Sequence, residues 1–105
     1  MSKEEPVELD IPDGVATSDQ SVEVLRGWIA DGSLMVSLNA DAFGDRVIDW
    51  GRLLAEIGHH IAKAAEMNGH MAYHEGLQAI EKGFGQNMST GQPSMTGKLR
   101  GRKSH

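Results

Sequence analysis

The sequence predicts a small α+β domain, in which a two-stranded sheet packs against three helices in the order β-α-β-α-α, followed by a disordered basic tail. Two short segments alternate apolar and polar residues, and three longer segments repeat apolar residues at helical spacing. With 105 residues, 39% of them hydrophobic and 24% charged, the chain has the composition of one globular domain. We predict a flexible N-terminus over residues 1–5, a single domain over 6–85 and the tail over 86–105.

The first strand and the first helix are predicted before residue 32. Residues 7–11 alternate apolar and acidic side chains, which is the period of a half-buried strand, and a proline ends this segment. Thr17 and Gln20 have the spacing of a capping box, so a helix is predicted over 18–31, with Gly32 as its left-handed C-cap. The apolar stripe of this helix would consist of Val22, Leu25, Trp28 and Ile29.

Residues 33–39 give the clearest strand pattern in the chain. Leu34, Val36 and Leu38 would point to one face, and Met35 and Ser37 to the other. The following turn-rich segment contains Phe43, which we expect to anchor it to the core. A sheet of only two strands is marginal without further partners. We therefore expect either that the helices cover it or that its edge pairs with a second copy of the chain, and we favour a homodimer.

Two long helices are predicted next, over 46–67 with Asp45 as N-cap and over 70–84. Each has an apolar face and, beside it, a stripe of small residues at spacings of four, three and four. Interior glycines cost a helix about 1 kcal/mol each, which is easiest to explain if another backbone approaches closely. We expect the two stripes to face each other in a helical hairpin, with simple weakness of the third helix as the alternative. The stripes are Gly51, Ala55, Gly58 and Ala62, and Ala72, Gly76, Ala79 and Gly83.

Charge is divided unevenly along the chain, whose net charge is -5. All acidic residues lie at or before Glu81, whereas the tail carries four cations and no acid. An acidic body repels phosphate backbones, so we expect no nucleic-acid binding by the folded part and only weak, salt-sensitive contact by the tail. The candidate contact residues for nucleic acid or an acidic partner are Lys98, Arg100, Arg102 and Lys103.

A run from Glu23 to Leu38, followed by Asp41–Phe43 and then by Trp50–Ile57, resembles a family of short uncharacterised bacterial proteins, a domain of unknown function. The resemblance covers about residues 5–82 and omits the tail. It implies a small cytoplasmic bacterial protein and implies no activity.

Histidines supply the one candidate metal site. His70 and His74 are four residues apart, the spacing at which one helical face presents two imidazoles to a metal ion. In an antiparallel hairpin His60 would lie near them, and Glu56 or Glu75 could add a carboxylate. A partly buried structural role for His60 is the alternative, and no fuller metal-binding signature is present.

The remaining motifs exclude several classes of function. Without cysteine the chain has neither disulfides nor a thiolate nucleophile, and it contains no nucleophile elbow, P-loop or dinucleotide-binding fingerprint. No apolar run is long enough for a membrane helix, and we expect no secretory signal. We therefore expect a cytoplasmic protein-interaction or regulatory module rather than an enzyme, with no cofactor and an unknown protein partner. The alternatives are a histidine-based metal-binding protein and a weak nucleic-acid binder.

Overall fold

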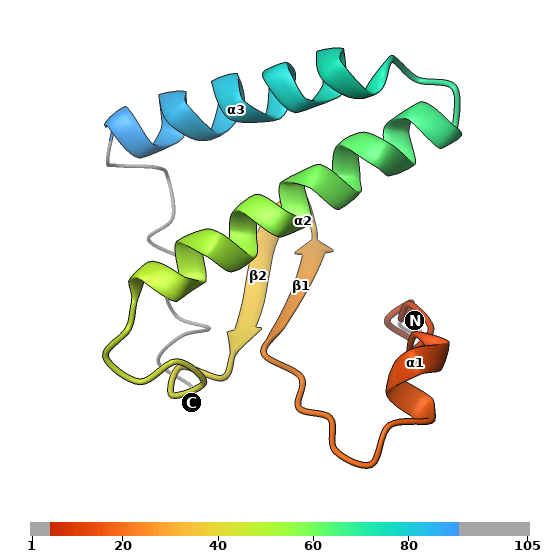
Figure 1. Cartoon of the computed structure of the whole chain (residues 1–105), viewed down its shortest axis with the longest axis vertical. Helices are drawn as coiled ribbons and strands as arrows, with labels where there is room; N and C mark the ends of the chain where they lie inside the picture. The colour runs from red at the N-terminus through yellow and green to blue at the C-terminus, as the bar shows by residue number, and fades with distance from the viewer. Residues whose placement is uncertain (1–4, 91–105) are drawn as a thin grey trace.

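A computed structural model of the chain describes residues 5–90 and confirms an α+β fold with a two-stranded sheet (Figure 1). The order of the elements is α-β-β-α-α, so the predicted order of the first two was wrong. Close packing between elements in the described residues is confined to two pairs, strand on strand and long helix on long helix. The elements are α1 (Asp13–Ala16), β1 (Leu25–Ala30), β2 (Ser33–Leu38), α2 (Ile48–Met67) and α3 (Tyr73–Thr90).

The strands form an antiparallel hairpin in a region where the sequence predicted a helix over 18–31. Asp31 and Gly32 join the strands with φ of 51° and 80°, the positive values that a two-residue type I′ turn requires. Gly32 is therefore a turn residue and not a helix C-cap. The Asp-Gly pair forms the turn, and Ala30 and Ser33 on either side of it pair with each other. This turn signal outweighs the helical spacing of the apolar residues before it.

The strand pairing assigns side chains to the two faces of the sheet. Residues directly opposite each other share a face, and the register places Leu25 opposite Leu38 and Trp28 opposite Met35. The prediction that Leu34, Val36 and Leu38 share one face is confirmed. That face is apolar, and the Trp28 and Met35 side chains lie on the other one, where Met35 is 41% exposed.

Residues 5–24, which we call the N-terminal arm, precede the hairpin and contain only the four-residue helix α1. The strand predicted over residues 7–11 is not formed in the single chain. The capping box is also absent: Thr17 Oγ1 donates to the Asp13 carbonyl within 3.3 Å, and the Gln20 amide donates to Ser18 Oγ at 3.2 Å. These local bonds turn the chain between α1 and β1 without starting a second helix.

The long helices α2 and α3 are confirmed with shifted ends. Val47 is the N-cap of α2, not Asp45, and Asp49 in the first turn pairs with Arg46 (2.9 Å) and Arg52 (2.8 Å). Helix α3 starts three residues later than predicted and runs to Thr90, so the expected domain end at 85 falls within it. Between the helices the chain reverses direction at Gly69, whose φ is 79°.

Small residues mediate the contact between α2 and α3, as their spacing predicts. A Cβ on Gly76 would lie 3.5 Å from both Cα and Cβ of Ala62, and one on Gly58 would lie 3.6 Å from the Ile80 side chain. Gly58, Ala62 and Gly76 are the buried residues of the described part. Only part of each stripe makes this contact, since Gly51 at the start of the first stripe and Gly83 at the end of the second face open space.

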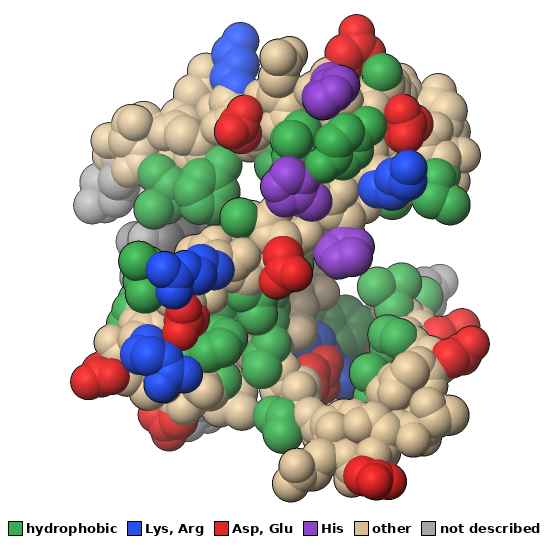
Figure 2. Space-filling model, in the orientation of Figure 1, with side chains coloured by type: hydrophobic (Ala, Val, Ile, Leu, Met, Phe, Trp, Pro, Cys, Tyr) green, Lys and Arg blue, Asp and Glu red, His purple; other side chains and the backbone are tan. Residues whose placement is uncertain are grey.

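No apolar core forms within the described residues of one chain. Ala62 is their only buried hydrophobic residue. The half-buried Phe43, in the segment between β2 and α2, packs edge-on against Trp50 of α2, with ring centroids 5.1 Å apart. Figure 2 shows hydrophobic side chains at the surface over the long helices and the arm. None of the described helices is long and apolar enough to cross a membrane. The exposed large hydrophobic residues are Val7, Leu9, Ile11, Val15, Val22, Ile29, Leu34, Met35, Val47, Ile48, Leu54, Ile61, Met67, Met71, Phe84 and Met88.

Candidate functional site

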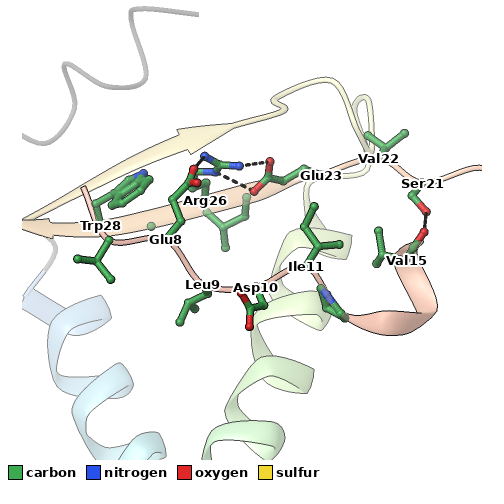
Figure 3. Close-up of a pocket in the computed structure, with 14 residues that line it drawn as sticks. Glu8, Leu9, Asp10, Ile11, Val15, Ser21, Val22, Glu23, Arg26 and Trp28 are labelled. Atoms are coloured by element: carbon green, nitrogen blue, oxygen red, sulfur yellow. Dashed lines mark hydrogen bonds and ion pairs between the residues drawn. The ribbon is translucent and has the colours of Figure 1, made fainter. Parts of the chain in front are cut away.

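The N-terminal arm and strand β1 line an open cavity within the described residues. Its volume is about 560 Å³, and Figure 3 shows the arm running alongside β1 with the cavity between them. One wall is the continuous segment Val7–Pro12 and the other is formed by Ser21–Glu23 and Leu25–Trp28. The lining is mostly apolar, so the cavity offers a surface for an apolar or amphipathic ligand rather than for a small polar one.

Arg26 is the one cation that lines this cavity, and it joins the two walls. Its guanidinium donates to both carboxylate oxygens of Glu23 (2.9 and 3.0 Å) and to Glu8 on the arm (3.0 Å). The same group lies 5.9 Å from the centre of the Trp28 ring. Hydrogen bonding to Glu23 raises the pKa of Arg26, and the bond from Arg26 lowers the pKa of Glu23. Both groups therefore remain charged at neutral pH.

The contact between Glu8 and Arg26 is the tertiary side-chain contact found for the arm. The other hydrogen bonds of the arm are local, such as Val15 N–H to the Pro12 carbonyl at 3.0 Å, except at its last residue, where the Val24 carbonyl accepts from the Asn39 N–H at 2.9 Å. Among residues 5–90, the backbone of residues 5–11 makes no hydrogen bond. The arm thus has a defined position beside β1. In the single chain, however, the backbone of residues 5–11 makes no hydrogen bonds and the apolar side chains of this segment are exposed.

The histidines proposed as metal ligands are not gathered into a site. His60, His70 and His74 are all exposed, and within residues 5–90 no group of three or more His, Asp or Glu side chains is arranged to hold a metal ion. Figure 2 shows histidines separate from one another over the long helices. The metal-binding hypothesis stays a prediction that this arrangement does not support.

His59, unlike His60 beside it, makes a specific side-chain contact, with Tyr73. Its Nδ1 lies 2.5 Å from the Tyr73 hydroxyl, and the two rings stack with centroids 6.2 Å apart and planes at 27°. This pair joins the middle of α2 to the start of α3. Glu66 supports the same connection by accepting a hydrogen bond from the Tyr73 amide at 3.2 Å. We assign these groups to the stability of the helical hairpin.

The other predicted contact residues, Lys98, Arg100, Arg102 and Lys103, lie outside the described residues. Sequence reasoning missed the arm cavity, because it placed Arg26 inside a helix. One signal was available: Arg26 is the only Lys or Arg between residues 4 and 45, in a stretch rich in acids. A single cation there is well placed to organise the surrounding carboxylates.

Comparisons with known proteins give a family and a similar structure. Residues 8–91 match a family described as a domain of unknown function (DUF5076). A solved structure described as that of "a putative pyruvate dehydrogenase from the photosynthetic bacterium Rhodopseudomonas palustrus CGA009" is 28% identical, with a TM-score of 0.64. The match covers 84% of this chain and 90% of that one, so the two are of similar length. The search of curated proteins found no match.

Proposed function

The chain belongs to the DUF5076 family. From its exposed apolar surface, we propose that it is a non-enzymatic protein-interaction module of the bacterial cytoplasm that completes its fold as a homodimer. One observation supports the proposal above all others. Within the described residues, one chain buries a single hydrophobic residue and exposes sixteen large ones. Soluble monomers rarely leave so many of their large hydrophobic side chains exposed while burying so few.

Energetic considerations favour a partner. Burial of apolar surface is the main favourable contribution to folding, at roughly 25 cal/mol per Å², and it must offset about 1–2 kcal/mol of backbone entropy for each ordered residue. A two-stranded hairpin is at best marginally stable by itself. Within the described residues, its two strands pack closely on each other and on no helix. A second copy is the partner always present at the concentration of the chain itself.

The solution mass of the full chain tests this proposal. We expect light scattering to give twice the 11.4 kDa of one chain at micromolar concentration. A mass of one chain, together with cooperative thermal unfolding, would contradict the homodimer. The control is the same measurement in high salt, because an apolar interface persists when weak charge contacts are screened.

The description of the similar structure points to a second candidate, an activity on pyruvate. The 28% identity and the similar length of the two chains support this candidate. Catalytic groups must be held rigidly and are usually desolvated, whereas the carboxylates and imidazoles of residues 5–90 are exposed or, for Asp49, half-exposed. We expect no loss of pyruvate when the purified chain is incubated with it and an electron acceptor, and measurable turnover would favour this candidate instead.

A further inference from the structure

Residues 7–11 of the arm have the chemistry of a strand without a sheet. Val7, Leu9 and Ile11 are exposed by 89%, 95% and 69%, and they alternate with the acidic Glu8 and Asp10. Prolines stand on both sides of these five residues, and proline cannot donate to a strand ladder. The segment is therefore limited to five residues that can pair as a strand.

Strand β1 has the complementary deficiency. It pairs with β2 along one edge, and the sheet has no further strand within residues 5–90. The outer edge of β1 faces the arm cavity, as Figure 3 shows. The backbone groups of residues 7–11 and those on the outer edge of β1 therefore have no hydrogen-bond partners within the described chain, and such an edge is a template for another strand.

We propose that the cavity between the arm and β1 is occupied by the arm of a second copy of the chain, so that residues 7–11 of each protomer form a strand on β1 of the other. The inference rests on the proposed homodimer and adds which segment crosses between the protomers. The chain's own arm cannot fill this cavity, because it forms one of the walls.

Length and apolar character favour the arm as the occupant. Strand β1 has six residues and can pair with the five-residue segment between the prolines, which is about 17 Å long when extended. Arg26, the one cation of the lining, already binds the carboxylates of Glu8 and Glu23, so charge gives no preference for an acidic segment. The apolar residues that alternate in the segment suit the mostly apolar lining.

Symmetry makes the exchange closed. In a twofold dimer each arm enters the cavity of the other protomer, so both β1 edges are paired and neither remains open for a third chain. Adding a strand to an exposed edge derives its affinity from main-chain hydrogen bonds and its specificity from alternate side chains. Both requirements are met by residues 7–11.

Amide hydrogen exchange of the unmodified full chain tests whether the arm is a strand. We expect the amides of residues 7–11 that face the ladder to exchange about tenfold or more slower than in an isolated peptide of this sequence. Exchange of all of them at the peptide's rate would overturn the proposal, because the backbone of one isolated chain provides no hydrogen-bond partner for them.

Cross-linking between two differently tagged copies tests which chain the strand belongs to. The chain has no cysteine, so Leu9→Cys can be placed in one copy and Gly27→Cys in the other without background. A side chain at Gly27 finds ordinary contact distances, 3.9 Å to Val36 and 4.0 Å to Leu34. We expect co-expressed copies, treated with a short bis-maleimide, to give a covalent heterodimer. An R26C copy in place of G27C covers the opposite face of the strand.

The control pairs Leu9→Cys with Glu81→Cys, an exposed position on α3, and should give only collisional background. A dimeric mass without the Leu9 cross-link to either β1 position would overturn the exchange and leave the proposed homodimer standing. A cross-link formed only within one chain carrying both cysteines would overturn it too. A monomeric mass would remove both proposals.

Discussion

At the scale of single residues, the helical hairpin depends on where a side chain has room. A Cβ on Gly76 would lie 3.5 Å from the Cα of Ala62, whereas one on Gly83 of the same helix would lie in open space. The two glycines have the same intrinsic helix penalty, so the difference between them measures the interhelical contact alone.

Gly76→Leu should therefore lower stability and Gly83→Leu should not. The branched side chain at 76 must push α2 away, at a cost of about 1–3 kcal/mol, while at 83 leucine gains up to about 1 kcal/mol of helix propensity. Thermal unfolding of both variants measures the difference. Equal melting temperatures would mean that the small-residue stripes only weaken α3.

Asp49 is the residue that links pH to the start of α2. Hydrogen bonds from Arg46 and Arg52 lower its pKa below the ordinary value of an aspartate. A lowered pKa in the folded state adds stability above the unfolded pKa, and this contribution is lost as the pH falls through the folded value.

Asp49→Asn should therefore reduce the melting temperature at neutral pH, and its difference from the unmodified chain should shrink as the pH falls through the lowered pKa of Asp49. Asp45→Asn is the matched control, because Asp45 precedes the helix without acting as its N-cap. A larger effect at Asp45 than at Asp49 would contradict the role assigned to the Asp49 ion pairs. Urea or thermal unfolding across pH 2–7 gives both curves.

At the scale of elements, the turn between β1 and β2 is the most demanding backbone feature. Gly32 has a φ of 80°, which a β-branched residue tolerates poorly. We expect Gly32→Val to destabilise the protein by about 1–3 kcal/mol and Asp31→Asn to be nearly neutral, because asparagine accepts a positive φ. Chemical denaturation compares the two, and equal losses would mean that the turn conformation is not what limits the hairpin.

The same turn explains which elements could be predicted from the sequence. The helical periods of α2 and α3 are long enough to be unambiguous, and β2 alternates without interruption. The residues before β2 are ambiguous, because Leu25, Trp28 and Ile29 fit both a helical stripe and a twisted strand. In the sequence alone, the Asp-Gly pair can end a helix or form a hairpin turn. Only the pairing of the strands on either side shows that it is a turn.

The candidate site was less predictable for a similar reason. Alternation in residues 7–11 indicates a strand, but the strand needs an edge supplied from outside the segment. Its side chains remain in water in the single chain, so the local pattern and the local structure disagree. Such a disagreement is expected where folding is completed by association.

At the scale of the whole molecule, association should make stability depend on concentration. When folding and dimerisation are coupled, each tenfold rise in protein concentration adds about 1.4 kcal/mol to the apparent stability. We expect the melting temperature to rise steadily over a hundredfold concentration series of the full chain. A constant melting temperature would show that one chain closes its core without a partner.

The exposed methionines give this surface a chemical reporter. Met35 lies on the sheet, Met67 and Met71 flank the helix connection, and Met88 lies near the end of α3. In a chain without thiols, peroxide acts first on such thioethers and converts them to polar sulfoxides. Mass spectrometry of the sulfoxides after brief oxidation will therefore map the surfaces that assembly shields. Prolonged oxidation will separate any protomers whose contact includes them.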